Sequence, residues 1–109
     1  MARAALAFLM LLASCDPGFT LQGDVVDVGG QPITDAQIVF ACNGNEMHRV
    51  APDTTGHFRD SWLGAFGDSC SVEVRRNGAK PISFNVMASC THPYTRDTCT
   101  EVTVHAVLP

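Results

Sequence analysis

The stretch that decides the fold is LQGDVVDVGGQPITDAQIVF, residues 21–40. Apolar or small residues occupy every second position near its start and again near its end, at Leu21, Gly23, Val25, Ala36, Ile38 and Phe40. A period of two is typical of half-buried β-strands. Between the two runs, Gly29-Gly30 can adopt positive φ angles and Pro32 fixes the returning backbone. The stretch therefore predicts a strand, a turn and a second strand.

A spaced pattern in this stretch resembles the opening of the carboxypeptidase regulatory-like domain, a transthyretin-like β-sandwich. The pattern is Gly23-x-Val25-x-Asp27-x-x-Gly30-x-Pro32-Ile33-x-x-Ala36-x-Ile38-x-Phe40. A second family element, Asp-x-x-Gly-x-Phe, is matched by Asp53-Thr54-Thr55-Gly56-His57-Phe58. In the family, this element makes a turn and sends its phenylalanine into the core. The resemblance covers residues 21–108 and implies an all-β fold, a seven-stranded Greek-key β-sandwich.

Alternation further along the chain predicts the remaining strands. Residues 46–51 read as a polar strand at a sheet edge. The strand that begins at Phe58 is expected to end or bulge at Asp60, since a lone carboxylate is not buried without a partner. The apolar residues 62–67 are expected to cover the core. Further strands are expected near residues 70–74, 80–86 and 100–108.

Length and charge limit the possible classes of function. The chain has 109 residues and a formal charge of −4, which becomes −5 once Arg3 (charge +1) is removed with a signal segment. This length supports one domain. The negative charge argues against electrostatic attraction to nucleic acid or to an anionic membrane surface. We therefore expect no nucleic-acid partner.

The N-terminus has the pattern of a bacterial export signal. Met1-Ala2-Arg3 is a short basic region, and residues 4–13 are apolar but too few to span a bilayer core of about 30 Å. Leu12-Ala13-Ser14-Cys15 resembles a lipobox, which implies cleavage before Cys15 and acylation of its thiol. We expect a signal peptide (1–14), a lipidated tether (15–20) and a β-sandwich (21–109). The domain would be anchored to a membrane of the bacterial cell envelope, facing the periplasm or the cell surface.

Four further cysteines allow three disulfide pairings. In transthyretin-like sandwiches the second and fifth strands are antiparallel neighbours, which implies a bond between Cys42 and Cys70. Cys90 and Cys99 then close a short loop. The rival interpretation makes Cys90, His92 and Cys99 metal ligands together with another histidine. An oxidising compartment favours disulfides, so we predict no metal site.

Known catalytic motifs are missing from the sequence. It has no His-Glu-x-x-His and no Gly-x-Ser-x-Gly, and it lacks the Tyr-Arg-Gly-Ser tail of the hydroxyisourate hydrolases, which share the transthyretin-like fold. His57 and His105 are expected to face solvent without a role. The prediction is a non-catalytic interaction or structural module of the envelope, with no catalytic residue and no cofactor. The alternative is an exported metal-binding or carbohydrate-binding protein.

Residues 90–99 form the candidate binding loop. Pro93 and the expected disulfide would stiffen it, so its side chains would lose little entropy when a partner binds. His92, Tyr94 and Arg96 are the candidate contacts, because aromatic and arginine side chains are enriched in binding hot spots. The expected partner is an unknown envelope protein or glycan. The alternative is that the bridge only pins a long loop.

Overall fold

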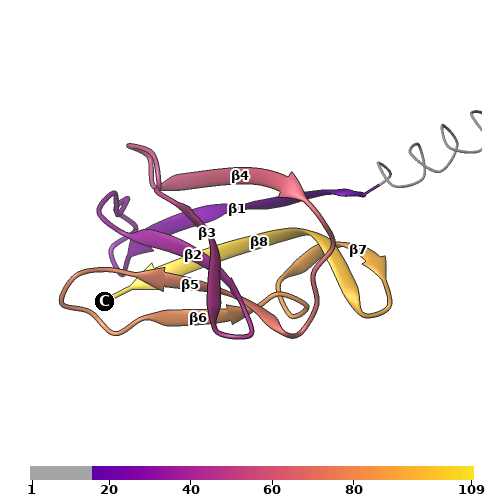
Figure 1. Ribbon diagram of the computed structural model, residues 1–109. Coiled ribbons are helices and arrows are strands. Elements are labelled where there is room, and N and C mark those ends of the chain that lie inside the picture. Colours follow the sequence, from indigo (N-terminus) through magenta and orange to yellow (C-terminus); the bar gives the residue numbers. More distant parts are fainter. Residues whose placement is uncertain (1–15) are drawn as a thin grey trace, which may run out of the picture.

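The computed structural model describes residues 16–109, so the expected signal segment and Cys15 lie outside the described residues. The described chain forms two packed β-sheets (Figure 1). Its strands are β1 (Gly18–Asp27), β2 (Gln37–Cys42), β3 (Asn45–Val50), β4 (His57–Leu63), β5 (Cys70–Arg75), β6 (Ile82–Asn85), β7 (Cys90–Thr95) and β8 (Thr98–Leu108). Residues 16–109 contain no helix long and apolar enough to cross a membrane.

Each sheet has four strands, in the orders β4-β1-β8-β7 and β3-β2-β5-β6. Strand β1 pairs antiparallel with β4 and parallel with β8. Strands β2 and β5 are antiparallel neighbours, and Cys42 lies opposite Cys70. The expected all-β sandwich is confirmed, and so is the position of the polar strand β3 at a sheet edge.

The inner faces of the two sheets build one core. Its fully buried members include Leu21, Val25, Ile38, Val72, Val102 and Val104. Four aromatic rings, those of Phe19, Phe40, Trp62 and Phe66, pack together with centroids 4.9–6.4 Å apart. Offset and edge-on pairs of this kind add to the hydrophobic stabilisation. Because Trp62 and Phe66 pack against the core, residues 62–67 cover it as expected.

Gly23 is required by the close approach of its neighbours. A Cβ atom built at this position would lie 1.9 Å from the carbonyl oxygen of Val104 and 2.8 Å from the ring of Phe58. The Phe58 ring is 4 % exposed and lies in the space that the missing side chain leaves. The two motifs that carry the family resemblance therefore meet in the core, since Gly23 lies opposite Phe58 in the register of β1 and β4.

The strand count differs from the expectation. Eight strands are present among the described residues instead of seven, because the segment expected as a loop contains β7, which pairs with β8. The pairing has several register shifts, and β7 is an edge strand. An edge position tolerates Pro93, which has no N–H to donate to a ladder.

The prediction that the strand ends or bulges at Asp60 was wrong. Strand β4 continues through this residue to Leu63, in regular register with β1. The prediction assumed that every second residue of this strand is fully buried. β4 is the edge strand of its sheet, and Asp60 is only half-buried there. The carboxylate accepts a hydrogen bond from the backbone N–H of Ser61 at 2.9 Å.

Candidate functional site

The outer face of the sheet β4-β1-β8-β7, called the open face below, carries a row of three polar side chains. Asp24 on β1 lies opposite His57 on β4 and opposite His105 on β8. All three positions alternate with inward apolar residues, so they point away from the core. We call His57, Asp24 and His105 the histidine row.

The Asp24 carboxylate orients the His105 ring. Nδ1 of His105 lies 3.1 Å and 3.2 Å from the two carboxylate oxygens of Asp24. A carboxylate can only accept, so Nδ1 must carry the proton of this hydrogen bond. In the neutral ring, Nε2 then keeps its lone pair and can accept a proton.

A second hydrogen-bond chain orients His57. The hydroxyl of Thr55 donates to Oδ1 of Asp53 at 2.6 Å, and Nδ1 of His57 lies 2.8 Å from the same hydroxyl oxygen. Because the hydroxyl hydrogen is directed to Asp53, the Thr55 oxygen accepts from His57, whose Nδ1 therefore carries a proton. Its Nε2 is left with the lone pair in the neutral ring.

Hydrogen bonds also hold the Asp53 carboxylate ionised. The side-chain hydroxyl of Thr55 lowers the pKa of Asp53 most, and the backbone N–H groups of Thr55 and His57 lower it further. These N–H groups donate to Oδ1 at 2.8 Å and 3.0 Å. This is the turn that the Asp-x-x-Gly-x-Phe element predicts. It fixes the position of Asp53, where the hydrogen-bond chain to His57 begins.

The two histidines border one shallow concavity of about 340 Å³. Its lining residues are Gln22, Gly23, Asp24, His57, Phe58, Arg59, Thr103 and His105. Gly23 and Phe58 contribute to this lining, although the Phe58 ring itself packs into the core. Arg59 and Thr103, each the Cα partner of Gln22 in its own strand pair, form the next polar row.

The chemistry available in this concavity is proton transfer at two oriented imidazoles. Two strand spacings of about 4.8 Å separate the backbones that carry them, and Asp24 lies on the strand between. Residues 16–109 contain no group of three or more His, Cys, Asp or Glu side chains arranged to hold a metal ion. The Arg59 cation borders the same hollow and can attract an anionic form of a substrate.

The site residues expected from the sequence lie elsewhere. Disulfides join Cys42 to Cys70 and Cys90 to Cys99, the two pairs that were expected. Cys90 and Cys99 are therefore not free thiolates that could bind a metal, as the rival interpretation required. Cys15, the expected lipidation site, lies outside the described residues.

The three candidate contacts of residues 90–99 lie on the β7–β8 hairpin. Nδ1 of His92 lies 3.2 Å from Oε2 of Glu101. Tyr94 is 56 % exposed, and the Arg96 side chain is almost fully exposed. None of the three lines the concavity of the histidine row.

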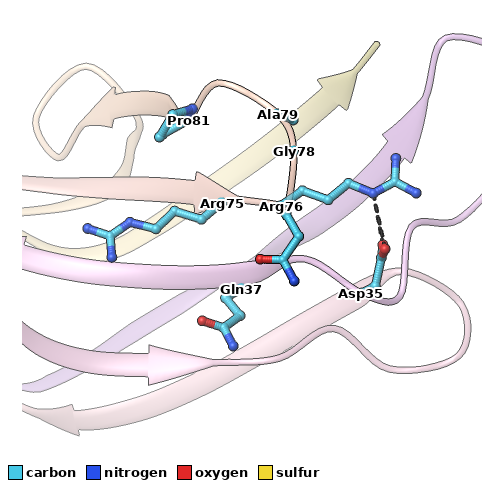
Figure 2. A pocket seen from close by; sticks show the side chains of 8 residues that line it. Asp35, Gln37, Arg75, Arg76, Gly78, Ala79 and Pro81 are labelled. Carbon is cyan, nitrogen blue, oxygen red and sulfur yellow. Dashed lines mark hydrogen bonds and ion pairs between the residues drawn. The ribbon is translucent and has the colours of Figure 1, made fainter.

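A second concavity lies at the turn between β5 and β6 and is bordered by Arg75 and Arg76 (Figure 2). Nε of Arg76 donates to both carboxylate oxygens of Asp35, at 3.0 Å and 3.2 Å. Arg75 is paired with Glu73 at 3.1 Å. Figure 2 shows the two arginine side chains extending in opposite directions. They therefore do not form a joint clamp for an anion.

No protein-family model and no curated protein matches the sequence. Solved structures with a similar fold include a chlorocatechol 1,2-dioxygenase from Pseudomonas putida, with a TM-score of 0.57 and 13 % identity over 85 % of this chain and 60 % of that one. Hydroxyquinol 1,2-dioxygenase from Pseudomonas putida DLL-E4 has a TM-score of 0.54 and 10 % identity, covering 87 % of this chain and 57 % of the enzyme. Catechol 1,2-dioxygenase from Acinetobacter sp. ADP1, inhibited by bound mercury, has a TM-score of 0.55 and 11 % identity, covering 86 % and 53 %.

These matches show the fold, and the chain spans 53–60 % of the length of the three enzymes. They also correct the prediction of a non-catalytic module. That prediction took the missing motifs as evidence against an enzyme, but the similar solved structures named above are all enzymes. A β-sandwich can assemble its polar groups from distant strands, where no contiguous motif records them.

Proposed function

We propose that the protein is an enzyme whose site is the histidine row, with His105 as general base. The observation that carries the proposal is the contact of both Asp24 carboxylate oxygens with Nδ1 of His105, beside a concavity that the ring borders. This contact leaves Nε2 as the proton acceptor. A positioned general base contributes roughly 10²–10⁴-fold to a reaction rate.

The second histidine extends the proposal to a proton relay. His57 also lines the hollow and keeps the lone pair of its Nε2, so it can accept a proton and, once protonated, return it. Asp24 holds the proton on Nδ1 of His105, and Arg59 stabilises an oxyanion formed in the hollow. All these steps use side chains that line the concavity.

The proposed substrate is a small hydroxylated compound. A hydroxyl group donates to Nε2 and loses its proton there, which produces the nucleophilic oxyanion. The enzymes of similar fold are named for catechol, chlorocatechol and hydroxyquinol. Aromatic diols are therefore the first compounds to test, and the hollow of about 340 Å³ is large enough for one aromatic ring.

We also propose that the protein is exported and held at a membrane by lipid on Cys15. The two disulfides support an oxidising compartment, and the Leu12-Ala13-Ser14-Cys15 pattern supports the anchor. The assignment to the carboxypeptidase regulatory-like, transthyretin-like sandwiches is likewise a proposal. It is supported by the contact between its two motifs, where the N–H of Val25 donates to the carbonyl of Gly56 at 2.8 Å.

Catechol binding tests the site directly. Ionised catechol absorbs at longer wavelength than the neutral form, so the spectrum of bound catechol reports proton transfer to the protein. We expect the bound ligand to ionise at lower pH than free catechol. His105→Gln should abolish that shift and weaken binding about tenfold or more, in line with loss of a hydrogen bond to a charged group.

His92→Gln is the matched control, because His92 also contacts a carboxylate through Nδ1 but lies away from the concavity. This variant should bind and ionise catechol as the unmodified protein does. If His105→Gln keeps the full spectral shift, the general-base proposal is wrong. If neither catechol nor hydroxyquinol binds the unmodified protein, the diol assignment is wrong.

A further inference from the structure

The end of the sandwich where β1 begins lies close to the proposed lipid attachment site. Only Asp16 and Pro17 separate Cys15 from Gly18, the first residue of β1. Three residues span at most about 11 Å. The carbonyl of Pro17 accepts a hydrogen bond from the N–H of Gly64 at 2.8 Å, so this short connection is already fixed to the sandwich.

Exposed side chains with apolar parts gather at the same end. Leu63, the Cα partner of Gly18, is 69 % exposed. The β7–β8 hairpin lies at the same end, as Figure 1 shows, and carries Tyr94 on β7 and Arg96 in its turn. Tyr94 is 56 % exposed, and the Arg96 side chain is 96 % exposed.

We propose that Leu63, Tyr94 and Arg96 rest in the headgroup layer of the membrane to which Cys15 is anchored. This inference rests on the proposed lipid anchor. A lipid chain on Cys15 brings this end of the sandwich to the bilayer surface, because the connection is too short to hold it away. Tyrosine favours the membrane interface, and arginine can lay its apolar stem there while its charge stays in water.

Charge does not drive this contact. Asp16 and Asp97 lie at the same end, Asp97 pairs only loosely with Arg96 at 3.9 Å, and the mature chain is net negative. The contact is therefore expected to be equally strong on neutral and anionic lipid and to resist salt. Burial of Leu63 and the Tyr94 ring supplies the favourable free energy.

The contact would also position the histidine row. Asp24 lies six residues along β1 from Gly18, which is about 20 Å at 3.3 Å per residue. The open face would then stand upright on the membrane, with its concavity in the aqueous phase. Substrate would reach the row from water rather than from the lipid.

Tryptophan fluorescence in lipid vesicles tests the contact. The acylated protein is purified from bacterial membranes, in a Trp62→Phe background that removes the native fluorophore, and reconstituted in phosphatidylcholine. Tyr94→Trp should lose about half or more of its emission when brominated lipid replaces ordinary lipid, because bromine quenches fluorophores at the interface. The matched control is Val28→Trp, 81 % exposed in the turn after β1 at the opposite end, which should not be quenched.

The outcomes separate this inference from its premise. Mass spectrometry of the N-terminus reports whether Cys15 is acylated. If the Tyr94→Trp protein is acylated but its emission is unaffected by brominated lipid, the membrane contact is overturned and the anchor stays intact. An unmodified Cys15 overturns both. Equal quenching of the Tyr94→Trp and Val28→Trp variants would show an unoriented domain, which also contradicts the proposal, and catechol binding is independent of all these results.

Discussion

The two outer faces of the sandwich differ in what covers them. On the outer face of β3-β2-β5-β6, called the covered face, Val39 is 0 % exposed although it points away from the core. Its Cα partners are Arg49 and Glu73, which are engaged in ion pairs with Glu46 and Arg75. Within residues 16–109, no such layer covers the histidine row on the open face, and a concavity lies there instead.

This difference shows that outward-pointing residues can have two roles in the same alternating pattern. On one sheet they cover and stabilise the fold, and on the other they border a candidate site. Long charged side chains can shield an apolar residue with their stems while their charged ends stay in water. On the covered face they do so over β2. On the open face, short polar residues such as Thr103 and Asp24 line the concavity.

The largest expected effect tests whether the covered face is a second buried layer. Val39→Asp places a carboxylate where the side chain has no exposure, and should cost about 3–5 kcal/mol of unfolding free energy. Ser61→Asp on the open face should change stability by no more than about 0.5 kcal/mol, because Ser61 is exposed. Urea denaturation followed by circular dichroism measures both. Equal losses would remove the distinction between the faces.

The disulfides allow a second comparison, since each belongs to one sheet. The bond between Cys42 and Cys70 spans 28 residues and that between Cys90 and Cys99 spans 9. The chain-entropy model gives losses of about 3.6 and about 2.6 kcal/mol when each pair is replaced by serine. Thermal unfolding of the two double variants should rank them in this order. The reverse order would show that the hairpin bond stabilises by more than loop closure.

The smallest expected effect is on the pH dependence of stability, and it compares one carboxylate from each sheet's surroundings, Glu46 on β3 and Asp53 in the turn before β4. Arg49 lowers the pKa of Glu46 on β3, whereas Thr55 lowers the pKa of Asp53 beneath His57. A carboxyl with a lowered pKa stabilises the fold above its unfolded pKa, near 4.5 for Glu46 and 3.8 for Asp53. That stabilisation is lost as the pH falls through the lower folded value.

Salt separates the two carboxylates. The Arg49 cation is screened at high ionic strength, but the Asp53 hydrogen bonds come from neutral groups. Between pH 2 and 5, the melting temperature of Glu46→Gln should depend less on pH than that of the unmodified protein, but only at low salt. The melting temperature of Asp53→Asn should depend less on pH than that of the unmodified protein at both low and high salt. Identical behaviour of the two variants in high salt would contradict this assignment of causes.

Local patterns predicted most of the fold. Alternation located the strands around Val25, Ile38 and Val102, and the glycine and aspartate turns located the reversals. The hairpin strand β7 was missed because Pro93 and its polar neighbours read as a loop, and only edge pairing with a bulged register makes such a strand possible. The continuation of β4 through Asp60 depends on its edge position, which is a property of the whole sheet.

The histidine row could not be predicted in the same way. Alternation placed His105 outward and the neighbouring turn glycine placed His57 in solvent, but Asp24 and His105 are 81 positions apart in sequence. Their contact depends on the parallel pairing of β1 with β8, which no local pattern records. The usable signal was the outward polar residue on each of three strands, and it becomes informative only once the strand order is known.

The same pairing of β1 with β8 governs when the domain can fold. β1 lies between β4 and β8. The edge of β1 that faces β8 therefore stays unpaired until the eleven residues of β8, Thr98–Leu108, are available. Contacts of such long sequence separation close late and slow the folding reaction. During synthesis or export, the sheet β4-β1-β8-β7 would stay incomplete until β8 had emerged. Removal of β8 would leave β1 paired with β4 alone, and an isolated two-stranded ribbon is marginally stable at best.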